Sequence, residues 1–233
     1  MSAIEQNAGA KERILARIRS AREAQESRRK IELQEIARHL DAHPRGPRLM
    51  IEDEAGMAGS MQARFLERAR AMASTFEEVA SMNQVPHAIA AYLIANGLPK
   101  EVVAWPEFSR LDWRAAEIDF ASRPAAASDL IGVTGAFCAI AETGTLLLLS
   151  GSETPATTSM LPETHFAIVH ADRIVATMEE AFMLVRGAHQ QLPRAVYFVS
   201  GPSRTADIEQ TIVLGAHGPY RLHILLVGRA SHS

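Results

Sequence analysis

Cysteine is the scarcest reactive residue in this sequence, with Cys138 as the one thiol among 233 residues. One thiol cannot form a disulfide within the chain. A cysteine-ligated iron–sulfur cluster within this sequence is also excluded, because such clusters need about four thiolates. Cys138 stands in the apolar run 136–141, where a buried and inert thiol is a better interpretation than a nucleophile. This sparing use of cysteine predicts a cytoplasmic, reducing compartment.

Long hydrophobic runs are lacking as well, and the longest apolar segments fall far short of the ~20 residues that a membrane helix needs. Charged residues from Glu5 to Arg13 interrupt any apolar stretch near the start, so we expect no secretory signal and no membrane span. The patterns Gly-x-Gly-x-x-Gly and Gly-x-x-x-x-Gly-Lys are also missing, which leaves a dinucleotide or ATP without motif support. We therefore predict no cofactor and no metal ion.

Charge is nearly balanced over the whole chain but is unevenly placed. The net charge of −3 gives no global reason to expect a nucleic acid or an anionic membrane as partner. Residues 11–48 hold 11 Lys or Arg and 6 Asp or Glu, a balance of +5, so the remainder carries −8. The basic stretch lacks the interleaved aromatic residues of a nucleic-acid-binding surface. A docking surface and a solvated helix remain the two interpretations of it.

The first part of the chain has the pattern of a helix. Between residues 11 and 40, Ile14, Ile18 and Ala21 share one face at three- and four-residue spacing, and charged residues fill the other faces. The cluster 43–47 then brings together two prolines and a glycine, which predicts a break. We therefore expect an N-terminal helical extension over 1–48 and an α/β domain over 49–233.

The rest of the chain predicts helices that alternate with short apolar strands. Strands that are apolar throughout and separated by helices indicate a mostly parallel sheet buried on both faces, with flanking helices. The predicted helices cover 57–75, 84–96, 175–185 and 205–214, and the predicted strands cover 102–105, 130–134, 145–149, 166–169, 195–199 and 222–227.

One motif predicts an anion site. The predicted strand 195–199 runs into Ser200, Gly201, Pro202, Ser203, Arg204 and Thr205, and a helix is expected to follow. The first amides of a helix and its positive partial charge attract anions, and an arginine beside them would bind a carboxylate in a fork. The alternative is a helix cap, formed by Ser203 or Thr205, beside a solvated Arg204.

A second motif joins two glycine turns, 132–135 and 141–145. Thr134 and Gly135 end the first turn, and the second reads Glu142, Thr143, Gly144 and Thr145. A carboxylate just before a buried strand suits a general base or an acyl-accepting nucleophile, so we take Glu142 as the catalytic candidate. The other ten named residues of the two motifs, leaving out Pro202, are candidates for substrate binding. On residue type alone, a structural bond from Glu142 to nearby turn amides is the more frequent role.

The histidines are scattered. His165 and His170 bracket the predicted strand 166–169 and should lie near its opposite ends. His217 lies in the loop 215–219, which follows the predicted helix 205–214. If that unit is a parallel crossover, His217 lies at the opposite edge of the sheet from Arg204, so we expect it in a turn or an interface.

Several stretches resemble the lactate utilization protein C family (LutC/YkgG), whose domain is called the LUD domain. The resemblance covers about residues 130–228 and is weaker in the N-terminal third. The matching stretches are Ala139–Leu146, Leu161–His165, Asp172–Val175, Ser200–Glu209 and Gly215–Pro219.

This resemblance implies a fold similar to ribose-5-phosphate isomerase, glucosamine-phosphate deaminase and the CoA transferases. It also implies a part in oxidising L-lactate to pyruvate, alongside iron–sulfur partner proteins. Some relatives with this fold carry an acid just after a Gly-Ala pair, whereas Gly135-Ala136 is followed here by Phe137. Glu142 is then the only acid in the motif.

Three functions stay open at this point. The first is a non-redox component of a lactate-oxidising system that binds a small organic anion near Arg204. The second is an independent enzyme of the CoA-transferase or isomerase type that uses Glu142. The third is an interaction protein that docks through its basic N-terminal helix.

Overall fold

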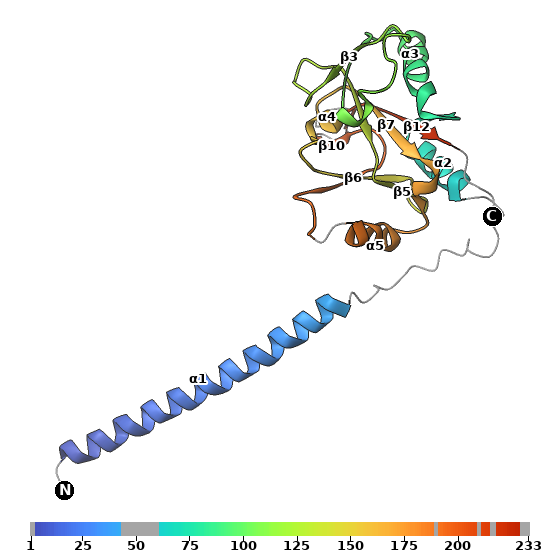
Figure 1. Cartoon of the computed structure of the whole chain (residues 1–233). Helices are drawn as coiled ribbons and strands as arrows, with labels where there is room; N and C mark the ends of the chain where they lie inside the picture. Colours follow the sequence, from blue (N-terminus) through green and yellow to red (C-terminus); the bar gives the residue numbers. More distant parts are fainter. Residues whose placement is uncertain (1–2, 43–60, 189–190, 209–210, 215–217, 229–233) are drawn as a thin grey trace. The chain divides into compact units, whose positions relative to one another are not determined.

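The computed structural model describes residues 3–42, 61–188, 191–208, 211–214 and 218–228 (Figure 1). The chain divides into two compact units, Met1–Glu52 and Asp53–Ser233. Helix α1 spans Ala3–Ala42, which confirms the helix predicted over 11–40. The predicted break at 43–47 lies outside the described residues. In its last turns α1 exposes Ile36 and Leu40.

The second unit is built on a six-stranded sheet whose strands are all parallel. Its order is β1-β12-β7-β4-β2-β3. This confirms the predicted fold class, a mostly parallel α/β sheet with flanking helices. The strands are β1 (Thr75–Val79), β2 (Glu101–Ala104), β3 (Asp119–Ser122), β4 (Ile131–Gly135), β7 (Thr164–His170) and β12 (Arg221–Val227).

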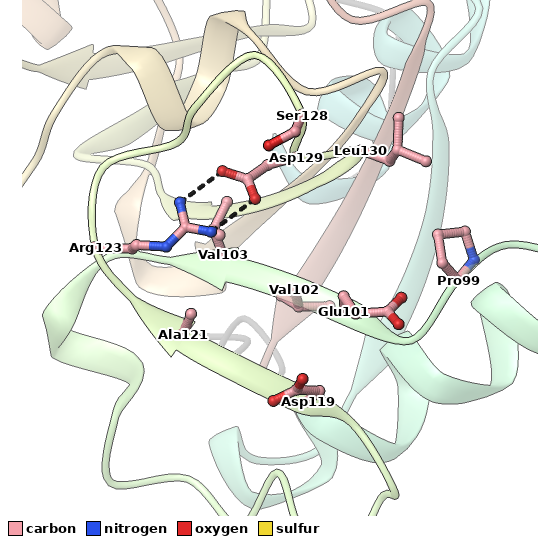
Figure 2. Close-up of a pocket in the computed structure, with 10 residues that line it drawn as sticks. All are labelled: Pro99, Glu101, Val102, Val103, Asp119, Ala121, Arg123, Ser128, Asp129 and Leu130. Atoms are coloured by element: carbon pink, nitrogen blue, oxygen red, sulfur yellow. Dashed lines mark hydrogen bonds and ion pairs between the residues drawn. The ribbon is translucent and has the colours of Figure 1, made fainter.

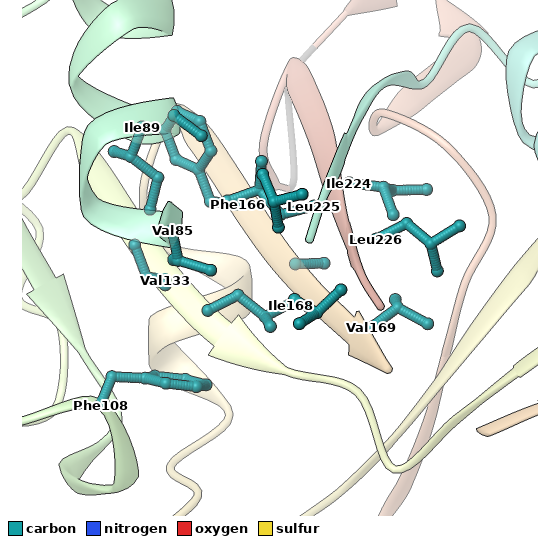
Figure 3. Close-up of a cluster of buried hydrophobic side chains, with 14 of the residues drawn as sticks. Val85, Ile89, Phe108, Val133, Phe166, Ile168, Val169, Ile224, Leu225 and Leu226 are labelled. Carbon is teal, nitrogen blue, oxygen red and sulfur yellow. The ribbon is translucent and has the colours of Figure 1, made fainter. Parts of the chain in front are cut away.

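Burial of the central strands explains their sequences. β4, β7 and β12 are almost wholly buried, so residues of both faces are apolar and the strands show no alternation. Figure 3 shows Val85 and Ile89 of helix α3 (Val85–Ala95) lying over Phe166 and Val133 of the sheet. Helix α3 carries a proline in its first turn and ends before Gly97, close to the bounds 84–96 predicted for it.

A second, four-stranded sheet has the order β8-β5-β6-β9. Its strands are β5 (Cys138–Ile140), β6 (Thr145–Leu149), β8 (Ile174–Val175) and β9 (Val196–Val199). Helix α5 (Met178–Ala188) packs on it through Ala181 and Val185, which contact Cys138, Ile140 and Leu147. Burial raises the pKa of the Cys138 thiol to about 11, which fits the predicted inert thiol.

The expectation that segments 145–149 and 195–199 join the parallel sheet is wrong. β6 pairs antiparallel with β5 and with β9, so both segments belong to the second sheet. An apolar strand buried on both faces looks the same in either sheet, and one partner of β6, strand β9, lies far along the chain.

The helix predicted over 205–214 is also wrong. Residues Arg204–Ile208 form β10 and Thr211–Leu214 form β11, and the two strands pair antiparallel. Five of the ten residues from 205 to 214 are β-branched, and such side chains favour strands over helices. The helix predicted over 57–75 is shorter, because α2 spans Met61–Ala71 and β1 begins at Thr75.

Short helical turns complete the described part of the unit. They are η2 (Met82–Gln84), η3 (Pro106–Phe108), α4 (Thr157–Met160) and η4 (Ala171–Arg173). Of these, η3 is central to the site, because it directly follows β2 at the carboxyl edge of the parallel sheet.

Candidate functional site

A cavity of about 350 Å³ opens at the carboxyl edge of the parallel sheet. Gly135 ends β4, His170 ends β7 and Trp105 directly follows β2, and all three line it. The loop after β6 closes another side with Ser150 and Thr154. The volume lies at the lower end of the range of small-molecule sites, about 300–1,000 Å³.

The topology explains why a cavity forms at this place. After β2 the chain goes to β3 on one side of the sheet. After β4 it goes to β7 and then β12 on the other side. The connections therefore diverge between β2 and β4, and open α/β sheets bind ligands at such a switch point, outside the carboxyl ends of the strands.

Glu107 is the acidic residue of this cavity, and it comes from η3. A Cβ atom added at Gly135 would lie 2.7 Å from Glu107 Oε1, so only a glycine lets the carboxyl group lie against the end of β4. Burial of the carboxyl group raises its pKa, and the nearby His170 acts in the opposite direction. Glu107 and His170 are both accessible to solvent, so they stand at the mouth of the cavity.

The interior of the cavity is mainly apolar. Phe108 and Ile168 are buried, and Phe137 and Leu149 are partly buried beside them. Trp105 directs its indole N–H to the Pro155 carbonyl at 3.2 Å, and so presents only apolar ring atoms to its other neighbours. The cavity thus combines an apolar wall with an acid and an imidazole at its mouth.

Sequence reasoning found Gly135 but missed Glu107. The two residues are brought together only by the pairing of β2 with β4. A usable signal was present, since Glu107 follows the predicted strand 102–105 at its carboxyl end. The acid that is missing after Gly135-Ala136 in the sequence is thus supplied in space by another segment.

The catalytic candidate Glu142 has a structural contact. Its Oε1 accepts a hydrogen bond of 2.8 Å from the Met178 amide, the first residue of α5. A carboxylate at a helix N-terminus satisfies a free amide and favours the positive end of the helix dipole. Its exposed neighbour Thr143 follows in the same turn.

The two predicted binding motifs meet across β6 and β9. Thr145 Oγ1 lies 2.6 Å from Ser200 Oγ. Gly144 and Gly201 both have positive φ, and a Cβ atom on either would collide with the backbone of α2 or of the turn that follows it, at Arg68–Ala69 and at Met72. The close approach that these glycines allow is therefore made by the chain itself.

The structural basis of the predicted anion site does not hold. No helix follows Gly201, because β10 begins at Arg204, and the amide of Ser203 donates to the Pro219 carbonyl at 2.7 Å. The Arg204 side chain is exposed. The side chain of Thr205 and the residue His217 lie outside what the structure describes.

The parallel crossover on which the predicted separation of Arg204 from the loop 215–219 depends is not formed. Arg204 pairs with Leu214, and the Ser203 amide donates to the Pro219 carbonyl, so the hairpin returns the chain to its start. A parallel crossover would have placed the loop one helix length away.

Thr134 and His165 form a buried pair. Thr134 Oγ1 and His165 Nε2 are 2.7 Å apart, and both residues are at most 1% exposed. Burial lowers the pKa of His165 to about 4, so the imidazole is neutral at pH 7. Their burial favours a structural role for this pair over contact with a substrate.

A second cavity, of about 360 Å³, lies over β2 and β3 (Figure 2). Arg123 is paired with Asp129 through two hydrogen bonds of 2.6 and 2.7 Å. The other charged residues that line it, Glu101 and Asp119, face each other across the two strands. These carboxylates disfavour a small organic anion there.

Within the described ranges no group of three or more His, Cys, Asp or Glu is arranged to hold a metal ion. Among the same residues, no helix is both long enough and apolar enough to cross a membrane.

Comparison with known proteins first defines the class of fold. A crystal structure of a DUF162 family protein from Deinococcus radiodurans superposes with a TM-score of 0.54 at 23% identity. The superposition covers 72% of this chain and 96% of that one. It shows that the fold of the second unit is shared.

The family follows from the sequence itself. Residues 63–227 match the LUD domain, and the chain belongs to this family. It is 41% identical over 106 residues to lactate utilization protein C 1 of Bacillus mycoides, covering 44% of this chain and 45% of that protein. It is 36% identical over 97 residues to lactate utilization protein C of Anoxybacillus flavithermus, covering 42% and 43% of the two. The matched segments thus span less than half the length of these relatives.

Proposed function

We propose that this chain is a non-redox component of a bacterial L-lactate utilization system, located in the cytoplasm. In this proposal it acts with iron–sulfur partner proteins that oxidise L-lactate to pyruvate. The observation that carries the proposal is membership of the LUD domain family together with similarity to proteins named lactate utilization protein C. The single cysteine supports the non-redox role, since a four-thiolate cluster would have to reside in a partner.

Reconstitution tests this proposal. Lactate oxidation by the purified iron–sulfur proteins would be measured with and without this chain, and the chain would also be assayed alone. We expect pyruvate to form at the full rate only in the complete mixture. An unchanged rate without the chain would contradict the proposal. Turnover of a CoA ester by the chain alone would instead favour the transferase alternative that uses Glu142.

The finer part of the proposal is binding of a small organic anion beside Arg204. Its support is the exposed guanidinium next to the turn 200–203, since a guanidinium recognises carboxylates through a fork of hydrogen bonds. At an exposed site such a contact is weak, about 1 kcal/mol or less. Arg204→Ala should therefore weaken lactate or pyruvate binding by at most about fivefold.

Isothermal titration with lactate and pyruvate measures this effect. Arg194→Ala is a matched control, because Arg194 is also exposed and lies in the same half of the chain. Equal affinity of the Arg204→Ala and Arg194→Ala variants would remove Arg204 from the site, without touching the role in lactate utilization.

A further inference from the structure

The switch-point cavity combines volume, mainly apolar walls and a charged group among the described residues. Glu142 and Arg204, the charged residues of the two sequence motifs, do not line this cavity. Its acid, Glu107, accepts no hydrogen bond within the described part of the chain. A carboxylate beside an apolar wall without a donor is an available acceptor.

We infer that this cavity binds a ring-containing organic ligand, uncharged or cationic, that donates a hydrogen bond to the carboxylate of Glu107. The ligand is distinct from the small anion of the proposed function.

The apolar side chains that line the cavity indicate that the ligand has an apolar, ring-containing part. Phe108, Phe137 and Trp105 line the cavity together with Ile168 and Leu149. Aromatic side chains pack favourably against other rings by stacking or by edge-to-face contact. A volume of about 350 Å³ also exceeds what lactate or pyruvate would fill, and poorly filled space loses contacts on every side.

The polar groups at the mouth of the cavity indicate the polar part of the ligand. An ionised carboxylate at Glu107 attracts an ammonium or hydroxyl donor and repels a carboxylate. The one other ionisable group that lines the cavity is His170, which accepts or donates according to its protonation state. The Ser150 hydroxyl accepts from the Ala195 amide at 2.8 Å, and its own proton remains for a ligand acceptor.

The carboxyl group of Glu107 lies close to the backbone of residue 135, and this position requires a glycine there. A methyl group there would come within 2.7 Å of Glu107 Oε1. Because that oxygen is the far end of a flexible side chain, Gly135→Ala should displace the carboxyl group and leave the fold intact. The same variant should therefore lose ligand affinity without losing stability.

The test uses tyramine, a phenol that carries an ammonium group, and para-hydroxyphenylacetate, in which a carboxylate replaces the ammonium end. Binding to the full chain would be measured by titration calorimetry. We expect tyramine to bind at least about tenfold more tightly than the anion. Glu107→Gln and Gly135→Ala should each weaken tyramine binding by up to about fivefold, because Glu107 is exposed and a charge-assisted contact at an exposed site contributes about 1 kcal/mol or less.

Two matched variants control for general effects. Glu77 is an exposed acid on β1, so Glu77→Gln removes a charge away from the cavity. A Cβ atom at Gly187 on α5 would meet nothing within 4 Å, so Gly187→Ala adds a methyl group without contact. Both should bind tyramine as the unchanged chain does.

Other outcomes overturn the inference. They are absence of tyramine binding at millimolar concentration, equal binding of the two probes, and full affinity in a folded Glu107→Gln variant. Circular dichroism and thermal unfolding would verify that each variant is folded. None of these results bears on reconstituted lactate oxidation, so the inference and the proposed function fail independently.

Discussion

Two glycine turns that look alike in the sequence have different neighbours in the structure. Gly135 lies against the end of a side chain, Glu107, at the mouth of a cavity. Gly201 lies against the backbone of Met72 and has a φ of +79°. At Gly135 the missing side chain leaves room for a functional group, and at Gly201 it leaves room for the chain's own packing. A glycine in a turn therefore indicates a close approach but not what approaches.

The largest expected change in stability should distinguish Gly201 from Gly135. Gly201→Ala introduces a methyl group into the Met72 carbonyl and forces a non-glycine residue to positive φ. Together these should lower the free energy of unfolding by about 2–5 kcal/mol. Gly135→Ala should cost less than about 1 kcal/mol, because a side chain moves more readily than a backbone. Urea unfolding of both variants measures the difference, and equal losses would contradict the distinction.

The buried histidines should have the next largest effect on stability, through its dependence on pH. Burial lowers the pKa of His165 and of His223 to about 4, below the value of about 6.5 in an unfolded chain. The unfolded state therefore binds protons that the folded state excludes, and stability falls as pH falls from about 6.5 towards 4. The slope should reach about 1.4 kcal/mol per pH unit for each imidazole.

A variant at His223 tests this assignment. The ring of His223 lies 4.2 Å from that of Tyr92, and its Nδ1 is 2.7 Å from Thr75 Oγ1. His223→Phe keeps a ring at this position but removes the titrating group. Stability measured at several pH values should show a slope about half as steep below pH 6.5. An unchanged slope would assign the acid sensitivity to other groups.

Much of the fold follows from the sequence because its signals are local. The apolar strands and the ends of α3 are marked by burial on both faces, by proline and by glycine. The second sheet is not marked in this way, since one antiparallel partner of β6 is the distant strand β9. The sequence of the hairpin β10–β11 predicts a helix because short apolar runs fit both periods, and only its β-branched content favours strands.

The candidate site follows from the sequence only in part. Gly135 was recognised from its turn, but the acid beside it comes from residue 107, and strand pairing is what joins them. Glu142 was selected by residue type, and its contact is a bond to the start of α5. Residue type alone does not distinguish a carboxylate that binds a ligand from one that caps a helix.

The smallest expected effect on stability comes from the hydrogen bond between Glu142 and the Met178 amide at the start of α5. Glu142→Ala leaves the Met178 amide without its partner and should cost about 0.5–2 kcal/mol, the usual range for a lost helix cap. Glu142→Gln keeps an oxygen acceptor and should recover most of this loss. Thermal unfolding of the two variants provides the measurement. A stability loss that is the same for both would show that the charge, and not the hydrogen bond, stabilises the helix start.

The comparison of the two glycine turns is tested most directly by locating a bound ligand. Titration of ¹⁵N-labelled protein with tyramine, followed by amide chemical shifts, reports which residues respond. We expect the largest changes at Glu107, Gly135 and His170, with little change at Gly144 or Gly201. The largest changes at Gly201 and Arg204, with none at Gly135, would contradict it.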